Sequence, residues 1–192
     1  MSRVHLVPAA ALVLALSAGL SAPARAERPA SKGIYAEAGL GGAALLGSNA
    51  QYAAVGPSLA LRLGTDLFSW LSVGVHLAAS SHEALVPPPP EGEWFQLYRG
   101  FGDVRLGFRH GALAMFVEGG AGAGYISSNV LAKVMVLDPG ERFSLAFTGG
   151  AGAEYQLQNR HYAFGLAGAY WMLPQFASTQ GAEGRLYLRY TY

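Results

Sequence analysis

Residues 59–63 have the sequence LALRL, and residues 71–77 have the sequence LSVGVHL. In both stretches an aliphatic residue stands at every second position, with a small, polar or charged residue between. Successive side chains of a β-strand point to opposite faces of the sheet, so this spacing predicts two strands with one wholly apolar face each. Arg62 and His76 fall on the other face. Each strand is therefore expected to separate its aliphatic side chains from its ionisable ones.

The same alternation recurs along the chain in eight segments of about ten residues. A tilted strand needs about 9–11 residues to cross a membrane, so each segment is long enough to do so. We therefore predict an all-β fold, an eight-stranded antiparallel up-and-down transmembrane β-barrel. The predicted strands are 34–44, 55–64, 70–79, 97–108, 113–124, 143–155, 162–172 and 183–192.

The connections between these strands fall into two classes of length. Outer-membrane barrels have short periplasmic turns and longer extracellular loops. We therefore expect the amino end of the barrel and its short turns to be periplasmic, and the longer connections to lie outside the cell. The short connections are 65–69, 109–112 and 156–161, and the longer ones are 45–54, 80–96, 125–142 and 173–182.

The ionisable residues of the predicted strands lie on the faces opposite the large apolar rows. A soluble sandwich would place its aliphatic side chains inside, whereas a membrane barrel places them outside. Eight strands enclose a space that side chains fill, and an unpaired charge there is costly. We expect a packed network of salt bridges, with a gated polar core or a proton path as the alternative, and we expect Arg99 near the outer mouth. The predicted lumen network is Glu37, Arg62, Asp103, Arg105, Glu118, Glu154, Arg185 and Arg189.

The first 26 residues have the features of a secretory signal peptide. Arg3 gives a basic start, residues 6–20 are apolar and uncharged, and Ala24-Arg25-Ala26 offers a cleavage site. The apolar run is too short for a membrane-spanning helix. We predict a cleaved signal peptide at residues 1–26, followed by a single outer-membrane β-barrel domain at residues 27–192.

The charge balance and the lack of cysteine narrow the possible functions. Two of the 13 basic residues lie in the signal peptide, which leaves 11 against 12 acidic residues. Such a chain has no basic stripe for a nucleic acid. It contains no cysteine for a disulfide or a lipid anchor, and no two histidines have a spacing suited to a metal ion. We expect no cofactor, no metal and no nucleic-acid partner.

Two glycine-rich stretches, at residues 116–125 and 147–155, are similar to each other. Their glycines lack the G-x-G-x-x-G spacing, and no helix is expected after them, which argues against a dinucleotide site. We interpret them as small residues within strongly curved strands.

The last seven residues, LYLRYTY, place large apolar side chains at alternate positions and end in an aromatic residue. Together with the signal peptide and the eight alternating segments, they resemble the small OmpA/OmpX-type outer-membrane β-barrel domains of Gram-negative bacteria. The resemblance implies an integral protein surrounded by outer-membrane lipid, with a structural or surface-interaction role, no catalysis and an unidentified extracellular partner. It also implies a C-terminal signal that the barrel-assembly machinery reads, with tyrosine replacing the commoner final phenylalanine. Its residues are Leu186, Leu188, Tyr190 and Tyr192.

Two other functions are weighed against this one. Some small outer-membrane barrels modify lipid A, and such an enzyme needs a serine, a histidine and an acid near the outer rim. His82 with Ser80 or Ser81, next to Glu83, offers this combination at the start of the second long connection. We predict no enzymatic activity and keep this lipid A-modifying enzyme as the alternative. A soluble periplasmic lipocalin-like binding barrel is the third hypothesis.

Overall fold

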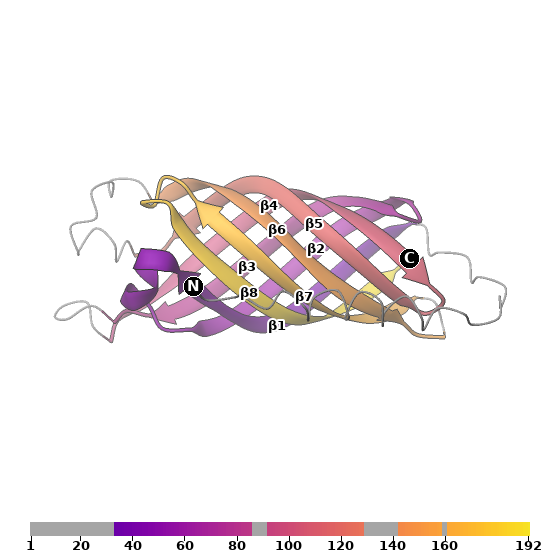
Figure 1. The fold of residues 1–192 in the computed structure, drawn as a ribbon, viewed down its shortest axis with the longest axis horizontal. Coiled ribbons are helices and arrows are strands. Elements are labelled where there is room, and N and C mark those ends of the chain that lie inside the picture. The colour runs from indigo at the N-terminus through magenta and orange to yellow at the C-terminus, as the bar shows by residue number, and fades with distance from the viewer. Residues whose placement is uncertain (1–32, 86–91, 129–141, 159–160) are drawn as a thin grey trace, which may run out of the picture.

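The computed structural model describes residues 33–85, 92–128, 142–158 and 161–192, and the predicted signal peptide lies outside these ranges. The described strands form one sheet that closes on itself (Figure 1), which confirms the predicted eight-stranded antiparallel up-and-down barrel. Within these ranges no helix is long and apolar enough to cross a membrane. The elements are β1 (Ile34–Leu46), the 3-10 helix η1 (Gly47–Tyr52), β2 (Gly56–Phe68), β3 (Leu71–Glu83), β4 (Trp94–His110), β5 (Leu113–Ile126), β6 (Phe143–Gln156), β7 (Tyr162–Leu173) and β8 (Thr179–Thr191).

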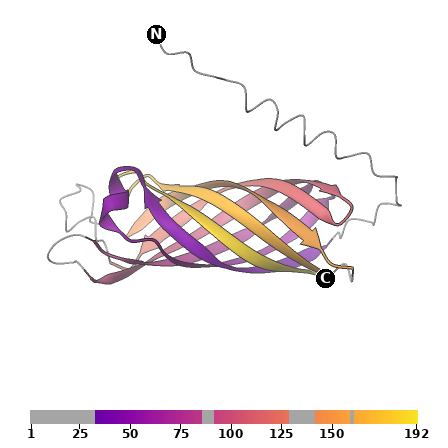
Figure 2. The same ribbon diagram turned by 60° about the horizontal axis from the view of Figure 1, so that its bottom comes forward.

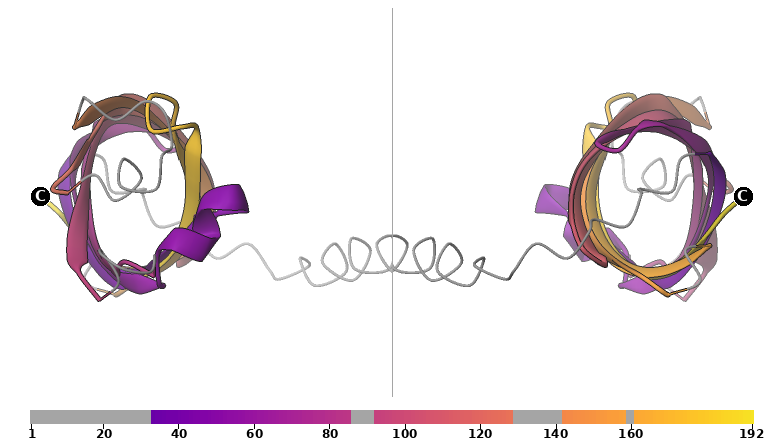
Figure 3. Two further views of the ribbon diagram at one scale, coloured as in Figure 1. Left: turned by 90° about the vertical axis from the view of Figure 1, so that its left-hand side faces the viewer. Right: turned by 90° about the vertical axis from the view of Figure 1, so that its right-hand side faces the viewer.

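Closure of the barrel depends on the pairing of the first strand with the last. β1 pairs with β8 from Tyr35↔Thr191 to Leu46↔Gln180, and it pairs with β2 along its other edge. Figure 2 shows β1 and β8 side by side, and the end-on views of Figure 3 show a closed ring. A closed sheet leaves no unpaired edge, which is the condition for strands to cross hydrocarbon.

The two ends of the barrel differ in their connections. Ser69 and Trp70 join β2 to β3, so Trp70, predicted to begin a strand, lies in a turn instead. Gly111 closes the turn between β4 and β5 with a φ of 61°, a conformation that glycine adopts without strain. These turns lie at the end where β1 begins and β8 finishes, which we call the short-turn end. η1 lies at the other end, the long-connection end (Figure 1).

Two neighbouring strands extend further toward the long-connection end than their alternation predicts. β3 runs to Glu83 and β4 starts at Trp94, although residues 80–96 were expected to form a connection. The prediction was wrong because Ser80 and Ser81 give no contrast between the two faces. The alternation therefore fades before the ladder ends at Glu83↔Trp94.

The barrel wall is apolar outside, and its charged side chains point inside. Leu40, Leu63 and Leu186 point outward and are 69%, 65% and 69% exposed, whereas Arg62 points into the lumen and is 2% exposed. On the outward faces of the described strands the only carboxylate or guanidinium belongs to Glu83, at the far end of β3. This polarity is the reverse of that in a soluble barrel or sandwich.

Candidate functional site

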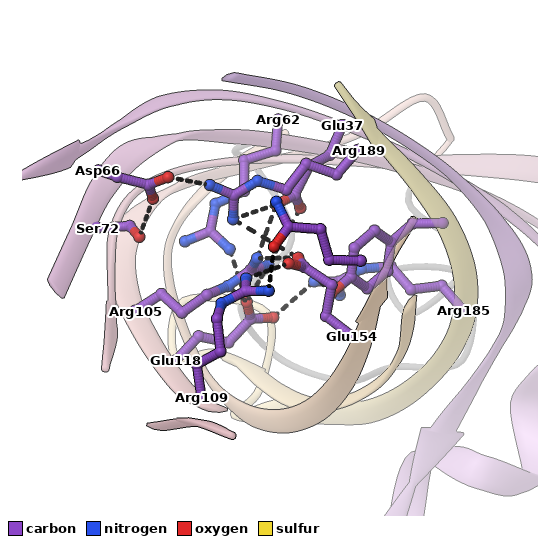
Figure 4. A network of polar contacts seen from close by, with 12 residues as sticks. Glu37, Arg62, Asp66, Ser72, Arg105, Arg109, Glu118, Glu154, Arg185 and Arg189 are labelled. Carbon is purple, nitrogen blue, oxygen red and sulfur yellow. Dashed lines mark hydrogen bonds and ion pairs between the residues drawn. The ribbon is translucent and has the colours of Figure 1, made fainter. Parts of the chain in front are cut away.

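A cluster of ion pairs fills the middle of the lumen, and Glu118 of β5 is its hub (Figure 4). Its Oε2 accepts hydrogen bonds from Arg62 Nη1 at 2.7 Å and from Arg105 Nη2 at 3.0 Å. Its Oε1 accepts one from Arg185 Nη2 at 2.6 Å. These arginines come from β2, β4 and β8, so a single carboxylate links strands on different sides of the barrel.

Glu37 of β1 forms a second centre beside the first. Arg105 donates to both of its carboxylate oxygens, at 2.7 and 3.0 Å, a bidentate geometry that is strong and directional. Arg189 Nη1 lies 3.6 Å from Glu37 Oε1 and 3.6 Å from Glu154 Oε2. Arg105 and Arg189 therefore connect Glu37 to carboxylates on β5 and β6.

Asp103 of β4 joins the network through Arg62 Nη2, at 2.7 Å, and both side chains are 2% exposed. The structure thus places every residue of the predicted lumen network inside the barrel and links each one to another by an ion pair. These residues are Glu37, Arg62, Asp103, Arg105, Glu118, Glu154, Arg185 and Arg189.

The network continues toward the short-turn end through two residues in segments that were predicted to be turns. Asp66 Oδ2 pairs with Arg189 Nη2 at 2.5 Å, and Asp66 Oδ1 accepts a hydrogen bond from Ser72 Oγ at 2.5 Å. Arg109 Nη2 donates to Glu154 Oε1 at 2.9 Å. The side chains of Asp66 and Arg109 are 9% and 18% exposed, so the ionic interior reaches the mouth of the barrel at this end.

Toward the other end the network includes a carboxylate that sequence reasoning missed. The expectation that Arg99 lies at the outer mouth is wrong, because its side chain is 1% exposed and donates to Glu183 Oε2 at 2.7 Å. Its Cζ lies 4.5 Å from the centroid of the Trp171 ring. Glu183 also accepts a hydrogen bond from Arg185 at 3.1 Å. The period-two count along β8 could have found Glu183, since it shares the face of Arg185 and Arg189.

The lumen charges balance one another. Among the residues that the structure describes, six arginines and six carboxylates form lumen ion pairs. The guanidinium of Arg105 also lies 4.0 Å from the Phe116 ring centroid, and that of Arg189 lies 3.8 Å from the Tyr35 ring centroid. Buried charges are tolerated when they are paired and hydrogen-bonded, so this arrangement suits a filled interior.

A cluster of apolar side chains packs in the half of the lumen nearer the long-connection end. Phe95, Leu97 and Phe101 of β4 pack with Trp171 and Leu173 of β7, and none of the five is more than 4% exposed. The prediction of a polar lumen therefore describes the half nearer the short turns and is incomplete for this half, where apolar side chains pack beside the buried Ser80 and His82. We call this cluster the apolar plug.

Several lumen glycines make room for aromatic rings from neighbouring strands. A Cβ at Gly181 would stand 2.0 Å from Cζ2 of Trp171, and a Cβ at Gly165 would stand 2.0 Å from Cζ of Tyr187. Gly152, in the second glycine-rich stretch, lies beside the ring of Phe116 in the same way. The interpretation of these glycines as sites of curvature is thus incomplete, because the rings occupy the volume that a side chain would fill.

The candidate catalytic residues lie within β3 and not in a loop. Ser80 and His82 face the lumen and are 3% and 0% exposed, whereas Ser81 and Glu83 lie on the opposite face of the strand. The ring of Phe95 stacks on the imidazole of His82 at 5.5 Å. The structure therefore brings Ser80 and His82 together, separates them from Ser81 and Glu83, and covers them.

The hydrogen bonds of His82 define its proton positions. Its Nδ1 lies 3.0 Å from the carbonyl oxygen of Ala54, and its Nε2 lies 2.9 Å from Ser80 Oγ. A carbonyl can only accept, so Nδ1 carries a proton, and in the neutral ring Nε2 accepts from the hydroxyl of Ser80. The partner that orients the ring is thus a backbone carbonyl and not a carboxylate. In the described parts of the chain, no three His, Cys, Asp or Glu residues converge as metal ligands would.

The predicted C-terminal signal lies on the outer face of the barrel. Leu186, Leu188 and Tyr192 are 69%, 40% and 73% exposed. The ring of Tyr190 packs against the rings of Tyr162 and Tyr192, with centroids 4.9 and 4.8 Å away. These aromatic side chains gather at the short-turn end, as interfacial aromatic residues do in membrane barrels.

Comparison with known proteins identifies the fold. No protein-family model matches the chain, and no curated protein matches it. Neisserial surface protein A (NspA) is similar in structure, with a TM-score of 0.60 and 13% sequence identity over 83% of this chain and 97% of that one. Ail, the attachment invasion locus protein of Yersinia pestis, is also similar and was solved in complex with the heparin analogue sucrose octasulfate. Its TM-score is 0.57, with 12% identity over 84% of this chain and 99% of that one. The chain therefore has the fold of the small eight-stranded outer-membrane β-barrels.

Proposed function

We propose that this protein is an integral barrel of a Gram-negative outer membrane with a structural or surface-interaction role and no catalytic activity. The observation that carries the proposal is the reversed polarity of the wall. Aliphatic rows cover the outside, while six arginines and six carboxylates of the described chain pair within the lumen. Water is a poor solvent for such an outer face, and hydrocarbon is a good one.

In the proposed orientation the short-turn end faces the periplasm and the long-connection end faces the outside. The support is the length of the connections, which is short at the end where β1 begins. Outer-membrane lipid surrounds the wall, and the barrel-assembly machinery recognises Leu186, Leu188, Tyr190 and Tyr192 during biogenesis. Their outward position leaves these side chains accessible to a partner while the barrel is being built.

A surface-interaction role is supported by the proteins of similar fold. One of them is called a surface protein, and another is an attachment protein solved with a sulfated sugar analogue. In this chain the lumen offers no free ionic group to such a ligand, because each described lumen guanidinium has a carboxylate partner. Binding would therefore fall to the long-connection end.

Gel migration tests the proposal directly. The membrane fraction is run in SDS with and without boiling, after a carbonate wash. A folded membrane barrel should stay in the pellet and should migrate differently once it is boiled. Release by the wash would instead support the soluble lipocalin-like alternative.

A lipid A-modifying enzyme is the second candidate, favoured by the hydrogen bond from Ser80 to His82 Nε2. This pair has the tautomer that a serine nucleophile needs, although both residues are closed to solvent. Mass spectra of lipid A from cells with the protein, without it and with Ser80→Ala distinguish the two functions. We expect three identical profiles, and a species lost in the last two would establish the enzyme.

A further inference from the structure

A ridge of aliphatic side chains runs along the outer face of β2 and β3, with a groove on each side of it. We call these the β1 groove and the β4 groove, after the strands at the centre of their floors. Their volumes are about 420 and about 320 Å³. The ridge residues are between 46% and 65% exposed, and they are Leu59, Leu61, Leu63, Val75 and Leu77.

The β1 groove exists because two alanines stand among larger residues. Ala36 and Ala38 form its floor, and each has a large apolar neighbour on both adjacent strands. Ile34 and Leu40, 65% and 69% exposed, stand beyond its two ends on the same strand and face. The flanking pairs are Leu63 with Tyr190 and Leu61 with Leu188.

This groove fits within the hydrocarbon of one leaflet, because Ile34 and Leu40 bound it along the strand. The six residue steps from Ile34 to Leu40 span roughly 20 Å along a strand. At a tilt of about 45° they cover a depth of about 14 Å, close to half of a hydrocarbon core of about 30 Å. The groove lies in the half of the barrel nearer the short turns, since Ala36 is only two residues from the start of β1.

The β4 groove lies in the other half of the wall. Its floor is made by Ala79, Gly100 and Ala123, on three consecutive strands. Tyr98, Tyr125 and Phe143 form its far wall, with ring centroids 6.2 Å apart for the first two and 4.9 Å apart for the last two. The two grooves therefore divide the thickness of the wall between them.

Both grooves are free of charge. Glu37, Arg62 and Arg99 are among the residues that line the grooves, but their side chains point into the lumen. These residues are 6%, 2% and 3% exposed. An occupant must therefore be narrow and wholly apolar. In a bilayer the molecules that meet this description are lipid acyl chains. A chain in a groove touches protein on three sides and gains dispersion contacts that a smooth wall does not provide.

We propose that each groove holds one acyl chain of a membrane lipid, from the periplasmic leaflet in the β1 groove and from the outer leaflet in the β4 groove. This rests on the membrane location and orientation proposed above. The grooves thus give the barrel two sites where a lipid stays bound, while the other lipids around the barrel exchange.

The test counts lipids that stay bound. The full-length barrel is reconstituted into dimyristoylphosphatidylcholine vesicles, extracted in a mild detergent and examined by native mass spectrometry. Ala38→Leu fills the β1 groove and Ala123→Leu fills the β4 groove. Ala151→Leu adds the same volume to the outer face between Val117 and Gly168, outside both grooves.

We expect two retained lipids in the wild type and in Ala151→Leu, one in each groove variant and none in the double variant. Equal retention in all of them would overturn the proposal. A wild-type dimer that Ala38→Leu converts to a monomer would show that a second copy is the occupant. If Ala38→Leu fails to fold by gel migration, Ala36→Leu replaces it. Failure of the wild type to float with the vesicles would instead contradict the membrane location itself.

Discussion

At the scale of single residues, the packing of the lumen depends most on Glu118, which balances Arg62, Arg105 and Arg185 at once. Glu118→Gln keeps the size of the side chain and removes its charge, so three buried guanidiniums lose a shared partner. Removing one side of a buried ion pair costs about 3–5 kcal/mol. We expect a loss of that order in the free energy of unfolding, measured with urea in detergent micelles.

The matched control is Glu83→Gln, which removes a carboxylate from the outer face at the end of β3. Its free energy of unfolding should stay within about 0.5 kcal/mol of the wild type. Equal unfolding midpoints for the two variants would contradict the role assigned to Glu118.

Gly181 and Gly184 of β8 offer a second test at this scale. A methyl group at Gly181 would collide with the ring of Trp171, whereas one at Gly184 would meet no atom within 4 Å. Overpacking costs about 1–3 kcal/mol, so Gly181→Ala should unfold at a lower urea concentration than Gly184→Ala. If both variants lose stability equally, the glycine is required for its backbone and not for the space beside the ring.

At the scale of the strand, we expect the cost of an arginine on the outer face of β2 to depend on its depth in the bilayer. Leu61→Arg puts a guanidinium on the outer face in the middle of the strand, and Leu67→Arg puts one at an exposed position in the irregularity near the short turns. The cost is about 2–4 kcal/mol at the bilayer midplane and about 0–1 kcal/mol near the interface. The fraction of heat-modifiable protein in membranes should fall for Leu61→Arg and hardly change for Leu67→Arg. Equal losses would argue against a membrane around β2.

The sequence predicts strands well where the two faces differ in chemistry. Over residues 56–64 of β2 and 71–79 of β3 large aliphatic residues alternate with charged or small ones, and there the predicted strands and faces agree with the structure. Near the long-connection end this contrast disappears. Phe95 and Leu97 point inward while Trp94 and Tyr98 point outward, so an apolar count cannot distinguish the faces there. The apolar plug was missed for this reason.

Whether a residue belongs to the ionic network can be predicted from its own strand, but which residue it pairs with cannot. The face on which Arg62 lies follows from its position in one strand, whereas its bond to Glu118 joins residues 56 positions apart. That contact depends on strand order, register and side-chain length together. Asp66 and Arg109 were missed because strand extension beyond the predicted ends places them on lumen faces.

At the scale of the whole molecule, two layers of different chemistry close the barrel along its axis. The ion-paired layer lies nearer the short turns, and the apolar plug lies nearer the long connections. We expect no stepwise conductance from the reconstituted protein in a planar bilayer. Trp171→Ala should not open a pore either, because the ion-paired layer remains. A stable wild-type channel would show that the described side chains do not occlude the lumen.

The distribution of ionic partners over the strands has a consequence for the order of assembly. The hairpin of β4 and β5 sets Arg105 opposite Glu118 early, but Arg185 and Arg189 arrive only with the last strand. Strands β1 to β7 together carry five of the six described lumen carboxylates but only four of the six arginines, so before β8 arrives the interior holds more negative than positive charge. Such an interior retains water, because removing water from unpaired ions is costly. The water therefore leaves only when β8 arrives. An incomplete ring still holds this water, which disfavours its entry into the bilayer.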